Sequence, residues 1–457
     1  MLDNPYGGKR SFFDKGNTKS YEFRLEQLRK LKEGIKKNET YIIDALTMDL
    51  GKPEFESYTA EIGVIYQEIN SAIKNLKKWM KRKIVPTPIF LLPAISYIYS
   101  EPKGVVLIVA PWNYPFQLIM SPLIGAIAAG NCAVLKPSNK SIRTQHIISK
   151  IIEDTFDENY ISFVEGHGSS TVNPLIENYR FDHIFFTGSV NVGKIILELA
   201  AKHLTTVTLE LGGKSPAIIH SDSDIDIAAK RIAWSKFYNV GQTCIAPDYV
   251  LVHESLKEEF IIKLQSYIKK YYGEHAEESS NYGRIISNDR FDKLISLLDK
   301  GNIISGGRSH RKIKYIEPTL IDGVDINSKI MKEEIFGPIL PILTYEDISE
   351  VVKIIRLNRY PLALYLFTKD KNIEDYIIES IEFGGGCINH AISHVINSNL
   401  PFGGVGFSGM GNYHSKYSFN TFSHQKSIFK ALTKFELNLK FPPYSEMKLK
   451  LAKKFLK

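Results

Sequence analysis

Cysteine is scarce in this chain of 457 residues, and its first residues lack the apolar core of a signal peptide. The 3 cysteines cannot all pair with one another, so the sequence does not support a disulfide framework. Disulfide-poor chains are typical of reducing compartments. We therefore expect a cytoplasmic protein.

Charged side chains are missing from residues 104–135. A membrane-spanning helix needs about 20 predominantly apolar residues, but prolines, asparagines and a glutamine interrupt this run. Continuous apolar runs are also typical of parallel strands that are covered on both faces. We therefore expect a buried strand, a loop, a buried helix and a second strand here, and no membrane span.

The sequence also lacks internal repeats, low-complexity tracts and zinc-ligand clusters, which argues against repeat architectures and a metal site. Its net charge of +8 is spread along the chain apart from the end, without a basic helix motif or an aromatic RNA platform. Nucleic acid is therefore not an expected partner. Since domains usually hold about 100–200 residues, the length indicates two or three domains.

What the sequence does contain is a repeated alternation of strand and helix patterns from residue 104 onward. This alternation predicts an α/β fold with parallel sheets and crossover helices. Before it, residues 20–48 and 57–82 have the periodicity of two amphipathic helices. Residues 84–101 indicate a β excursion broken by prolines.

A cysteine on a loop is the first candidate for chemistry. Cys244 stands in YNVGQTCIAPDYV (238–250), after Gly-Gln-Thr rather than inside a strand. A thiolate attacks carbonyl carbon well, and backbone N–H groups near such a loop favour the ionised form. The alternative is a small buried hydrophobe, which is the interpretation we prefer for Cys132 and Cys387.

Two further polar residues follow apolar strands. Glu210 precedes two glycines in LELGGKSP, where it is either a carboxylate satisfied by backbone donors or a desolvated general base. Asn113 lies between aromatic residues and prolines in VAPWNYPFQ. Its amide either caps the next helix or donates to a developing oxyanion.

Two strand ends suggest a nucleotide site. In FFTGSVNVGK a strand ends and a helix begins, with Gly188 and Gly193 at the turn, and free N–H groups at a helix start bind pyrophosphate. In LKPSN, Lys136 and Ser138 follow another strand at the sheet edge where cofactor riboses lie. The alternative for Lys136 is a solvated lysine.

Together and in this order, these motifs resemble the aldehyde dehydrogenase superfamily over nearly the whole chain. The short N-terminus, the CIAPDY continuation and SFNTFSH (418–424) are similar to its class 3 branch of fatty and aromatic aldehyde dehydrogenases. The matching segments are PWNYPF (111–116), LKPSN (135–139), FTGS with Gly193, ELGGKSP (210–216), GQTCIAPDYV (241–250), EEIFGP (333–338) and LPFGGVGFSGMG (400–411).

The resemblance implies a catalytic set. Cys244 is expected to add to the aldehyde and form a thiohemiacetal, while the Asn113 amide and the Cys244 backbone N–H hold the oxyanion. Hydride transfer to the nicotinamide then leaves a thioester, and Glu210 activates the water that hydrolyses it. Covalent capture makes hydride loss unimolecular, which agrees with this assignment.

The resemblance also implies a cofactor set. Lys136 is expected on the adenosine ribose, Ser189 on the pyrophosphate, Glu334 on the nicotinamide ribose and Phe336 beside the nicotinamide. The complete set is Lys136, Ser138, Asn139, Gly188, Ser189, Gly193, Leu211, Glu334 and Phe336.

One position departs from the family pattern. The family usually has glutamate at Asn139, where a carboxylate holds the adenosine ribose and repels a 2′-phosphate. Asparagine removes that repulsion, so we expect NAD as cofactor with relaxed discrimination against NADP.

The expected substrate is an apolar aldehyde, medium or long aliphatic or aromatic. The aromatic side chains suitable for an apolar tunnel are Tyr66, Trp112, Tyr114 and Phe402. None of the motifs contains an arginine that could bind a carboxylate group of the substrate. The alternative is that these aromatic residues belong to the ordinary core.

The resemblance further implies a homodimer with a Rossmann-type cofactor domain, an α/β catalytic domain and a small β bridging element. In the tail, Met447, Leu451 and Phe455 recur every four residues among lysines. This pattern is typical of a helix that contacts an anionic membrane surface, and the alternative is a helix that is solvated or packed in a dimer. The expected boundaries are 1–84 and 103–209 for the cofactor domain, 210–393 for the catalytic domain, 85–102 and 394–425 for the bridging element, and 426–457 for the tail.

Other functions stay open at this level. An acylating dehydrogenase uses the same cysteine but passes the thioester to coenzyme A, which Glu210 argues against. A catalytically retired binding protein on this fold would not need cysteine, glutamate, asparagine and lysine at all the matching sites. A cysteine hydrolase would leave the cofactor motifs unexplained.

Overall fold

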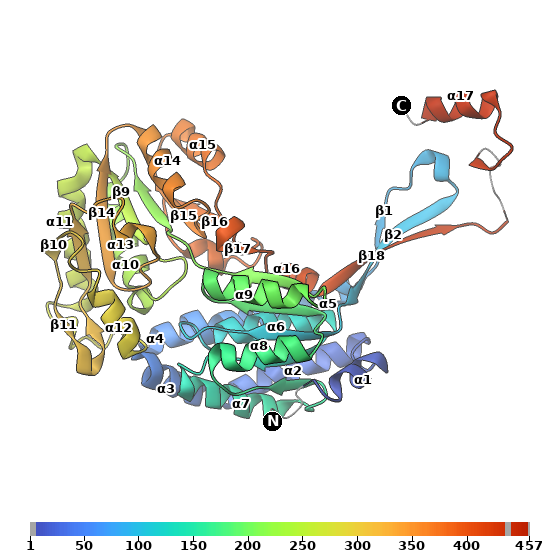
Figure 1. Ribbon diagram of the computed structural model, residues 1–457, viewed down its shortest axis with the longest axis horizontal. Coiled ribbons are helices and arrows are strands. Elements are labelled where there is room, and N and C mark those ends of the chain that lie inside the picture. The colour runs from blue at the N-terminus through green and yellow to red at the C-terminus, as the bar shows by residue number, and fades with distance from the viewer. Residues whose placement is uncertain (1–5, 435–439, 456–457) are drawn as a thin grey trace.

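The computed structural model describes residues 6–434 and 440–455. In these ranges, two α/β bodies lie side by side, and a narrow arm of strands projects away from them (Figure 1). This arrangement agrees with the α/β fold and the bridging element that the sequence predicts.

One of the two bodies contains most of the expected cofactor domain, and we call it the cofactor body. Its sheet has the strand order β17-β7-β6-β3-β4-β5, in which β3 to β7 are parallel and β17 is antiparallel. The order reverses between β3 and β6. In open α/β sheets, ligands bind at such a reversal, outside the carboxyl ends of the strands. The strands are β3 (Val105–Val109), β4 (Cys132–Lys136), β5 (Ile161–Phe163), β6 (His183–Thr187), β7 (Thr206–Glu210) and β17 (Gly409–Met410).

The uncharged run 104–135 forms the centre of this body. Strands β3 and β4 are buried along their whole length, and so is the helix α6 (Gln117–Ala129) that joins them. The expectation of a buried strand, loop, helix and strand is thus confirmed. Within the described ranges, no helix has both the length and the apolar character needed to cross a bilayer.

Helices pack on both faces of the sheet, and further helices pack on the outside of α6. Helices α2 and α5 pack on α6, and α8 packs on α9. The pattern over residues 20–48 predicts one helix, but the chain breaks at Asn38, whose side chain donates to the Gly34 carbonyl oxygen. The helices are α1 (Lys9–Asp14), α2 (Tyr21–Lys37), α3 (Glu39–Leu50), α4 (Glu54–Ser57), the π-helical turn η1 (Tyr58–Ile62), α5 (Gly63–Met80), α7 (Ile142–Thr155), α8 (Gly168–Asn178) and α9 (Val190–Ala201).

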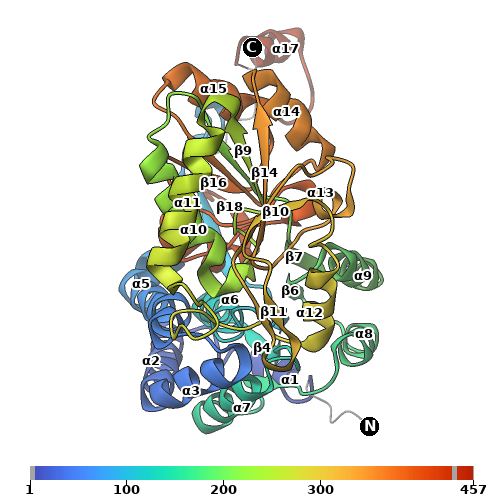
Figure 2. The same ribbon diagram turned by 90° about the vertical axis from the view of Figure 1, so that its left-hand side faces the viewer.

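The catalytic body repeats the doubly wound plan. Its sheet has the order β10-β13-β14-β9-β8-β15-β16, parallel except for β10, and α10 and α11 pack together on one side of it (Figure 2). The strands are β8 (Pro216–Ile219), β9 (Tyr249–His253), β10 (Asn302–Ser305), β13 (Thr319–Asp322), β14 (Ile339–Tyr345), β15 (Ala363–Phe367) and β16 (Gly385–Ile388), with the separate hairpin β11 (Ser309–His310) and β12 (Tyr315–Ile316). The helices are α10 (Ile225–Phe237), α11 (Lys257–Tyr272), α12 (Asn288–Ile295), α13 (Lys329–Lys332), α14 (Ile348–Leu357) and α15 (Lys371–Ser380).

The arm consists of β1 (Lys83–Val85), β2 (Ala94–Pro102) and β18 (Ser423–Ala431), and α17 (Glu446–Phe455) lies near its tip (Figure 1). The bounds differ from the expected bridging element, because β18 continues to Ala431. Within the expected range 394–425, β17 pairs with β7 and α16 (Lys416–Thr421) packs on α6. Most of that range therefore belongs to the cofactor body rather than to the arm.

Candidate active site

A cavity of about 960 Å³ lies at the carboxyl ends of β3, β4 and β6 and reaches the loop that carries Cys244. This is the edge at which the strand order reverses, as expected for a nucleotide site. Predicted residues from both bodies line it: Trp112, Asn113, Lys136, Ser138, Asn139, Gly188, Ser189, Glu210, Leu211, Cys244, Glu334 and Phe336.

At one side of the cavity a helix begins. Ser189 is the N-cap of α9, and its hydroxyl makes no capping bond, so the first N–H groups of the helix stay available for an anion. Gly193 does not line the cavity. A side chain there would meet Leu211, so the glycine lets α9 approach the strand end closely.

Two strand-end residues of the predicted ribose site differ in surroundings. The Lys136 ammonium is buried and donates to the Pro137 carbonyl oxygen at 2.8 Å, and burial lowers its pKa to about 8. It is therefore not the solvated lysine of the alternative. The Asn139 amide nitrogen lies 3.0 Å from Nδ1 of His167, a neighbour that the sequence motifs did not indicate.

The thiol at the other side of the cavity is half-buried. Burial raises the pKa of Cys244 to about 12, and the nearby carboxyl groups of Glu334 and Glu210 add to the rise. The backbone N–H groups of Cys244 and Ile245 lower this pKa, as the sequence predicts for such a loop, but the net shift is upward. Desolvation and the two acids outweigh the backbone N–H groups of the loop.

Among residues 6–434 and 440–455, neither carboxyl oxygen of Glu210 has a hydrogen-bond partner, although only 2% of the residue is exposed. Burial raises its pKa well above the ordinary value. Backbone donors do not satisfy it, so that alternative is excluded. A buried carboxyl group with free lone pairs, in a cavity shared with Cys244, is suited to holding a water molecule.

Glu334 is the second acid of the cavity. Burial raises its pKa to about 8, and the Gly213 backbone N–H donates to it. At Gly212 a side chain would collide with the Glu334 carboxyl group, so this glycine lets the acid approach. Arg290 also lines the cavity, with its guanidinium 5.7 Å from the Phe336 ring, and no motif in the sequence indicated it.

The Asn113 amide is buried and faces the nucleophile loop. Its Nδ2 donates to the main-chain oxygen of Gln242 at 3.0 Å, and it does not cap α6, whose N-cap is Phe116. An amide nitrogen has two hydrogens, so the second stays available for a ligand. The helix-cap alternative is therefore excluded.

Of the four aromatic residues proposed for the substrate, Trp112 is the one that lines the cavity, and it packs edge-on against Phe336 at 5.4 Å. The Tyr66 hydroxyl donates to Glu39. Tyr114 is buried with its hydroxyl 2.6 Å from Thr243 Oγ1, and Phe402 is buried against Tyr413. A substrate role for these three stays a prediction.

The chain is similar to known proteins over almost its whole length. The model of the aldehyde dehydrogenase family matches residues 10–428. The chain is 48% identical to 4,4'-diaponeurosporen-aldehyde dehydrogenase of Staphylococcus aureus, covering 100% of this chain and 99% of that protein. It is 44% identical to aldehyde dehydrogenase family 3 member A2 of Mus musculus, covering 98% and 92%.

Solved structures extend the agreement to three dimensions. A substrate-bound state of Staphylococcus aureus AldH matches with a TM-score of 0.97 at 48% identity over 99% of both chains. Indole-3-acetaldehyde dehydrogenase in complex with NAD+ matches with a TM-score of 0.86 at 27% identity, over 94% of this chain and 88% of that one. Since the family match spans almost every element of both bodies, the chain belongs to the aldehyde dehydrogenase family, in its class 3 branch, and is an oxidoreductase that oxidises aldehydes with a nicotinamide dinucleotide.

Proposed function

We propose that this enzyme oxidises an apolar aldehyde to the carboxylic acid, with Cys244 as nucleophile, Asn113 as oxyanion donor and Glu210 as the base that activates water. The observation that carries the proposal is the unpartnered, buried Glu210 in the cavity that Cys244 lines. A thioester on Cys244 lies within reach of a water molecule held by that acid only if the two groups share one space.

The first half of the reaction belongs to Cys244 and Asn113. The Cys244 thiol loses its proton to solvent, and its sulfur then forms a bond to the carbonyl carbon while the carbonyl electron pair moves to the oxygen. The free hydrogen of Asn113 Nδ2 donates to that oxygen, while Gln242 holds the other hydrogen and fixes the amide. The bound cofactor supplies the hydride acceptor and a positively charged ring.

The second half belongs to Glu210. Loss of hydride leaves a thioester on Cys244, and Glu210 takes a proton from water as the water oxygen attacks the acyl carbon. The carbon–sulfur bond then breaks, which releases the acid and restores the thiol. Burial raises the pKa of this carboxyl group, which makes its carboxylate a stronger base toward water. Transfer to coenzyme A is the competing outcome, and an absolute requirement for coenzyme A would identify it.

An apolar substrate is supported by the paired rings of Trp112 and Phe336 in the cavity that Cys244 also lines. It is also supported by the relative named for 4,4'-diaponeurosporen-aldehyde, which is nearly half identical over the whole chain. We extend this to medium or long aliphatic and aromatic aldehydes, fatty aldehydes included.

For the cofactor, we propose NAD with NADP as an accepted alternative. Ser189 and the start of α9 fit the pyrophosphate, and buried Lys136 fits a ribose hydroxyl. At the ribose end, Asn139 is neutral and His167 lies beside it, so position 139 provides no carboxylate to oppose a 2′-phosphate.

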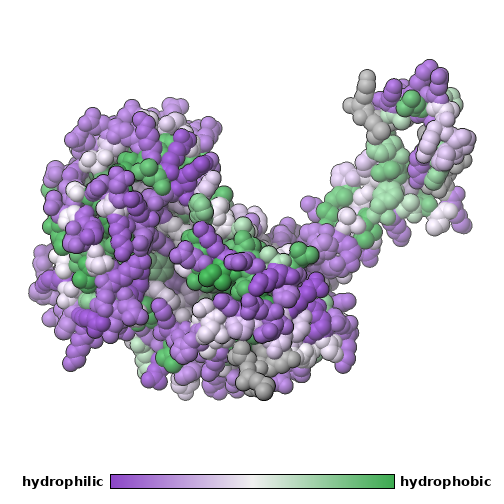
Figure 3. Space-filling view, in the orientation of Figure 1, coloured by the Kyte–Doolittle hydropathy of each residue, from purple (hydrophilic) through white to green (hydrophobic). Residues whose placement is uncertain are grey.

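The arm supports a homodimer. Ile84 is 75% exposed, Ile95 54% and Tyr99 42%, and the strand register puts all three on one face of the arm sheet. Figure 3 shows apolar residues gathered along this projecting part. An exposed apolar face on a narrow arm needs a covering surface, which a second copy of the chain would provide.

We also propose a cytoplasmic enzyme whose tail contacts membranes. Met447 and Leu449 of α17 are 70% and 55% exposed among lysines. The side chain of Phe455 lies outside the described residues. Co-sedimentation with anionic liposomes, with and without residues 446–457, tests the contact, and equal binding of both forms removes it.

The catalytic proposal is tested by absorbance at the reduced-nicotinamide band. NAD and NADP are each supplied with straight-chain aldehydes of increasing length and with benzaldehyde, and Cys244→Ala is the control. We expect turnover that rises with chain length and is lost in the variant. Undiminished turnover in Cys244→Ala would refute the assignment of the nucleophile.

A further inference from the structure

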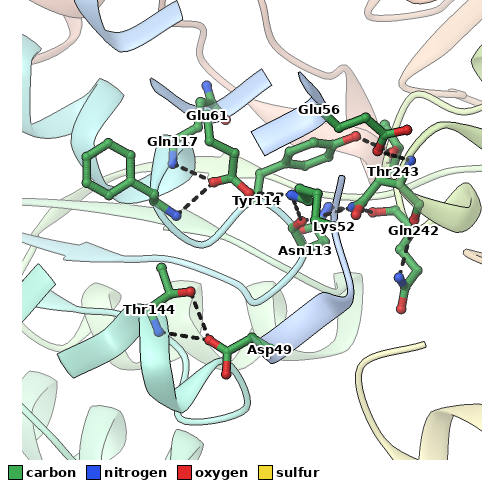
Figure 4. Close-up of polar contacts among 12 residues, drawn as sticks. Asp49, Lys52, Glu56, Glu61, Asn113, Tyr114, Gln117, Thr144, Gln242 and Thr243 are labelled. Atoms are coloured by element: carbon green, nitrogen blue, oxygen red, sulfur yellow. Dashed lines mark hydrogen bonds and ion pairs between the residues drawn. The ribbon is translucent and has the colours of Figure 1, made fainter. Parts of the chain in front are cut away.

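A buried ion pair lies behind the oxyanion donor (Figure 4). Lys52 and Glu61 pair with side chains that are 0% exposed. The other Glu61 oxygen accepts from the backbone N–H groups of Phe116 and Gln117 at 3.0 and 3.1 Å, at the start of α6. Glu61 lies in the π-helical turn η1, a local irregularity that is frequent at functional sites.

The Lys52 ammonium points from this pair toward Asn113. It donates to the Asn113 main-chain oxygen at 3.2 Å, and it lies 4.4 Å from the centre of the Tyr114 ring. Glu61 holds the lysine and also holds the helix that follows Asn113. The backbone of Asn113 is thus fixed from both directions by one buried pair.

A second donor reaches the same oxygen from the nucleophile loop. Nδ2 of Asn239 donates to the main-chain oxygen of Asn113 at 2.9 Å and to that of Gln242 at 3.1 Å. Gln242 is also the acceptor for the Asn113 amide. The Asn239 side chain therefore ties the strand-end loop of Asn113 to the loop that presents Cys244.

This bridge is held in a strained backbone. Asn239 and Val240 have φ of +52° and +56°, a left-handed conformation that non-glycine residues rarely adopt. The backbone N–H of Asn239 donates to the buried carboxyl group of Glu56 at 3.0 Å, which anchors the turn. Strain of this kind persists only where surrounding contacts over-determine the conformation.

We propose that Lys52 and Asn239 are positioning residues of the oxyanion site: both bind the main-chain oxygen of Asn113, and together they hold its amide at the distance from Cys244 that the addition step requires. The inference rests on the proposed role of Asn113. Neither residue lines the cavity, so each acts through Asn113 rather than on the substrate. Their loss therefore affects the transition state more than aldehyde binding.

Asn239→Gly is the sharpest test, because glycine keeps the left-handed backbone without strain and removes only the bridging amide. Loss of a whole oxyanion donor costs about 100- to 1,000-fold in kcat. A displaced donor costs less, and we expect kcat to fall by about 10- to 100-fold with KM changed less than about threefold.

Asn389→Gly is the matched control. Asn389 also has a left-handed backbone, with φ of +55°, and its side chain bonds both main-chain groups of Thr368 away from the cavity. We expect this variant to lose thermal stability to a similar degree with unchanged kcat. Equal falls of kcat in both variants would overturn the inference, because they would show that any loss of stability in the folded protein lowers kcat.

For Lys52 the variant is Lys52→Met combined with Glu61→Gln, which removes the pair without leaving one charge buried alone. The expected result is again a fall in kcat at nearly constant KM, with a circular dichroism spectrum like that of the parent. A parent-like kcat would remove Lys52 from the proposal.

A double-mutant cycle separates this inference from the proposed function. In an Asn113→Ala background, Asn239→Gly should lower kcat less than about twofold further, since its effect passes through Asn113. If Asn113→Ala alone keeps the parent kcat, the oxyanion assignment fails. If Asn113→Ala lowers kcat but the two losses simply multiply, the assignment stands and the positioning role fails.

Discussion

The cofactor preference can be changed by one substitution at the ribose end of the cavity. In Asn139→Glu, a carboxylate replaces an amide that is half-buried and lies 3.0 Å from His167. Two unit charges 4 Å apart repel by about 1 kcal/mol in water and about 4 kcal/mol near a protein surface. For a half-buried site facing a 2′-phosphate, about 2 kcal/mol is the working value.

This energy corresponds to about a 30-fold loss of kcat/KM with NADP and little change with NAD. The assay compares the two cofactors at saturating aldehyde in the parent, in Asn139→Glu and in the uncharged control Asn139→Gln. Because the effect is electrostatic, it should shrink as ionic strength rises. The reasoning is refuted if Asn139→Glu uses NADP as well as the parent does. It is also refuted if the parent prefers NAD by more than about a thousandfold, since Asn139 then provides no relaxed discrimination.

Four further predictions concern the thiol, the base and the arm. Without cofactor, the rate of alkylation of Cys244 by iodoacetamide should keep rising with pH toward about 12, and a plateau near pH 8 would contradict the raised pKa. At pH 8 the alkylation should be faster with NAD+ bound than in the free enzyme. Glu210→Gln should keep the first-turnover burst but lower steady-state turnover by about 100- to 10,000-fold, and an unchanged steady state argues against Glu210 as base. Because the pKa of Glu210 is raised in the folded state, the free energy of unfolding of the parent should fall as pH rises above about 4.5. Glu210→Gln lacks this titration, so chemical denaturation should show that it gains stability relative to the parent over that range. Ile95→Asp should shift the protein from dimer to monomer in sedimentation, and a parent that already sediments as a monomer rules out the arm interface.

Much of the fold could be predicted because parallel strands buried on both faces leave continuous apolar runs. Strands β3, β4 and β6 lie where these runs predict them. Helix α8 left no comparable signal, since its sequence GSSTVNPLIEN contains a proline and small polar residues. The break at Asn38 could not be predicted from the sequence either, because the helical pattern continues through it. Its side chain, rather than a backbone N–H group, donates to the Gly34 carbonyl oxygen.

The site divides in the same way. Residues that stand next to glycines or strand ends, such as Cys244 and Glu210, could be found from local sequence. Lys52 and Glu61 could not, because a charged residue between two helical patterns, like Lys52, or within one, like Glu61, usually faces solvent. Their burial depends on each other and on the main chain near Asn113, more than 50 residues further along the sequence. Only the folded chain brings such partners together.

The raised pKa values explain how the cavity accommodates two opposite tasks. The proposed reaction needs a thiolate at Cys244 for addition and a carboxylate at Glu210 for hydrolysis, yet burial raises the pKa of both groups, and the carboxyl groups of Glu334 and Glu210 raise that of the thiol further. Interacting acids lose their protons in succession rather than together. Addition consumes the thiolate charge before Glu210 is required, because the sulfur becomes a neutral thioester. The order of the chemical steps therefore lets one buried cavity use both groups while carrying one of these negative charges at a time.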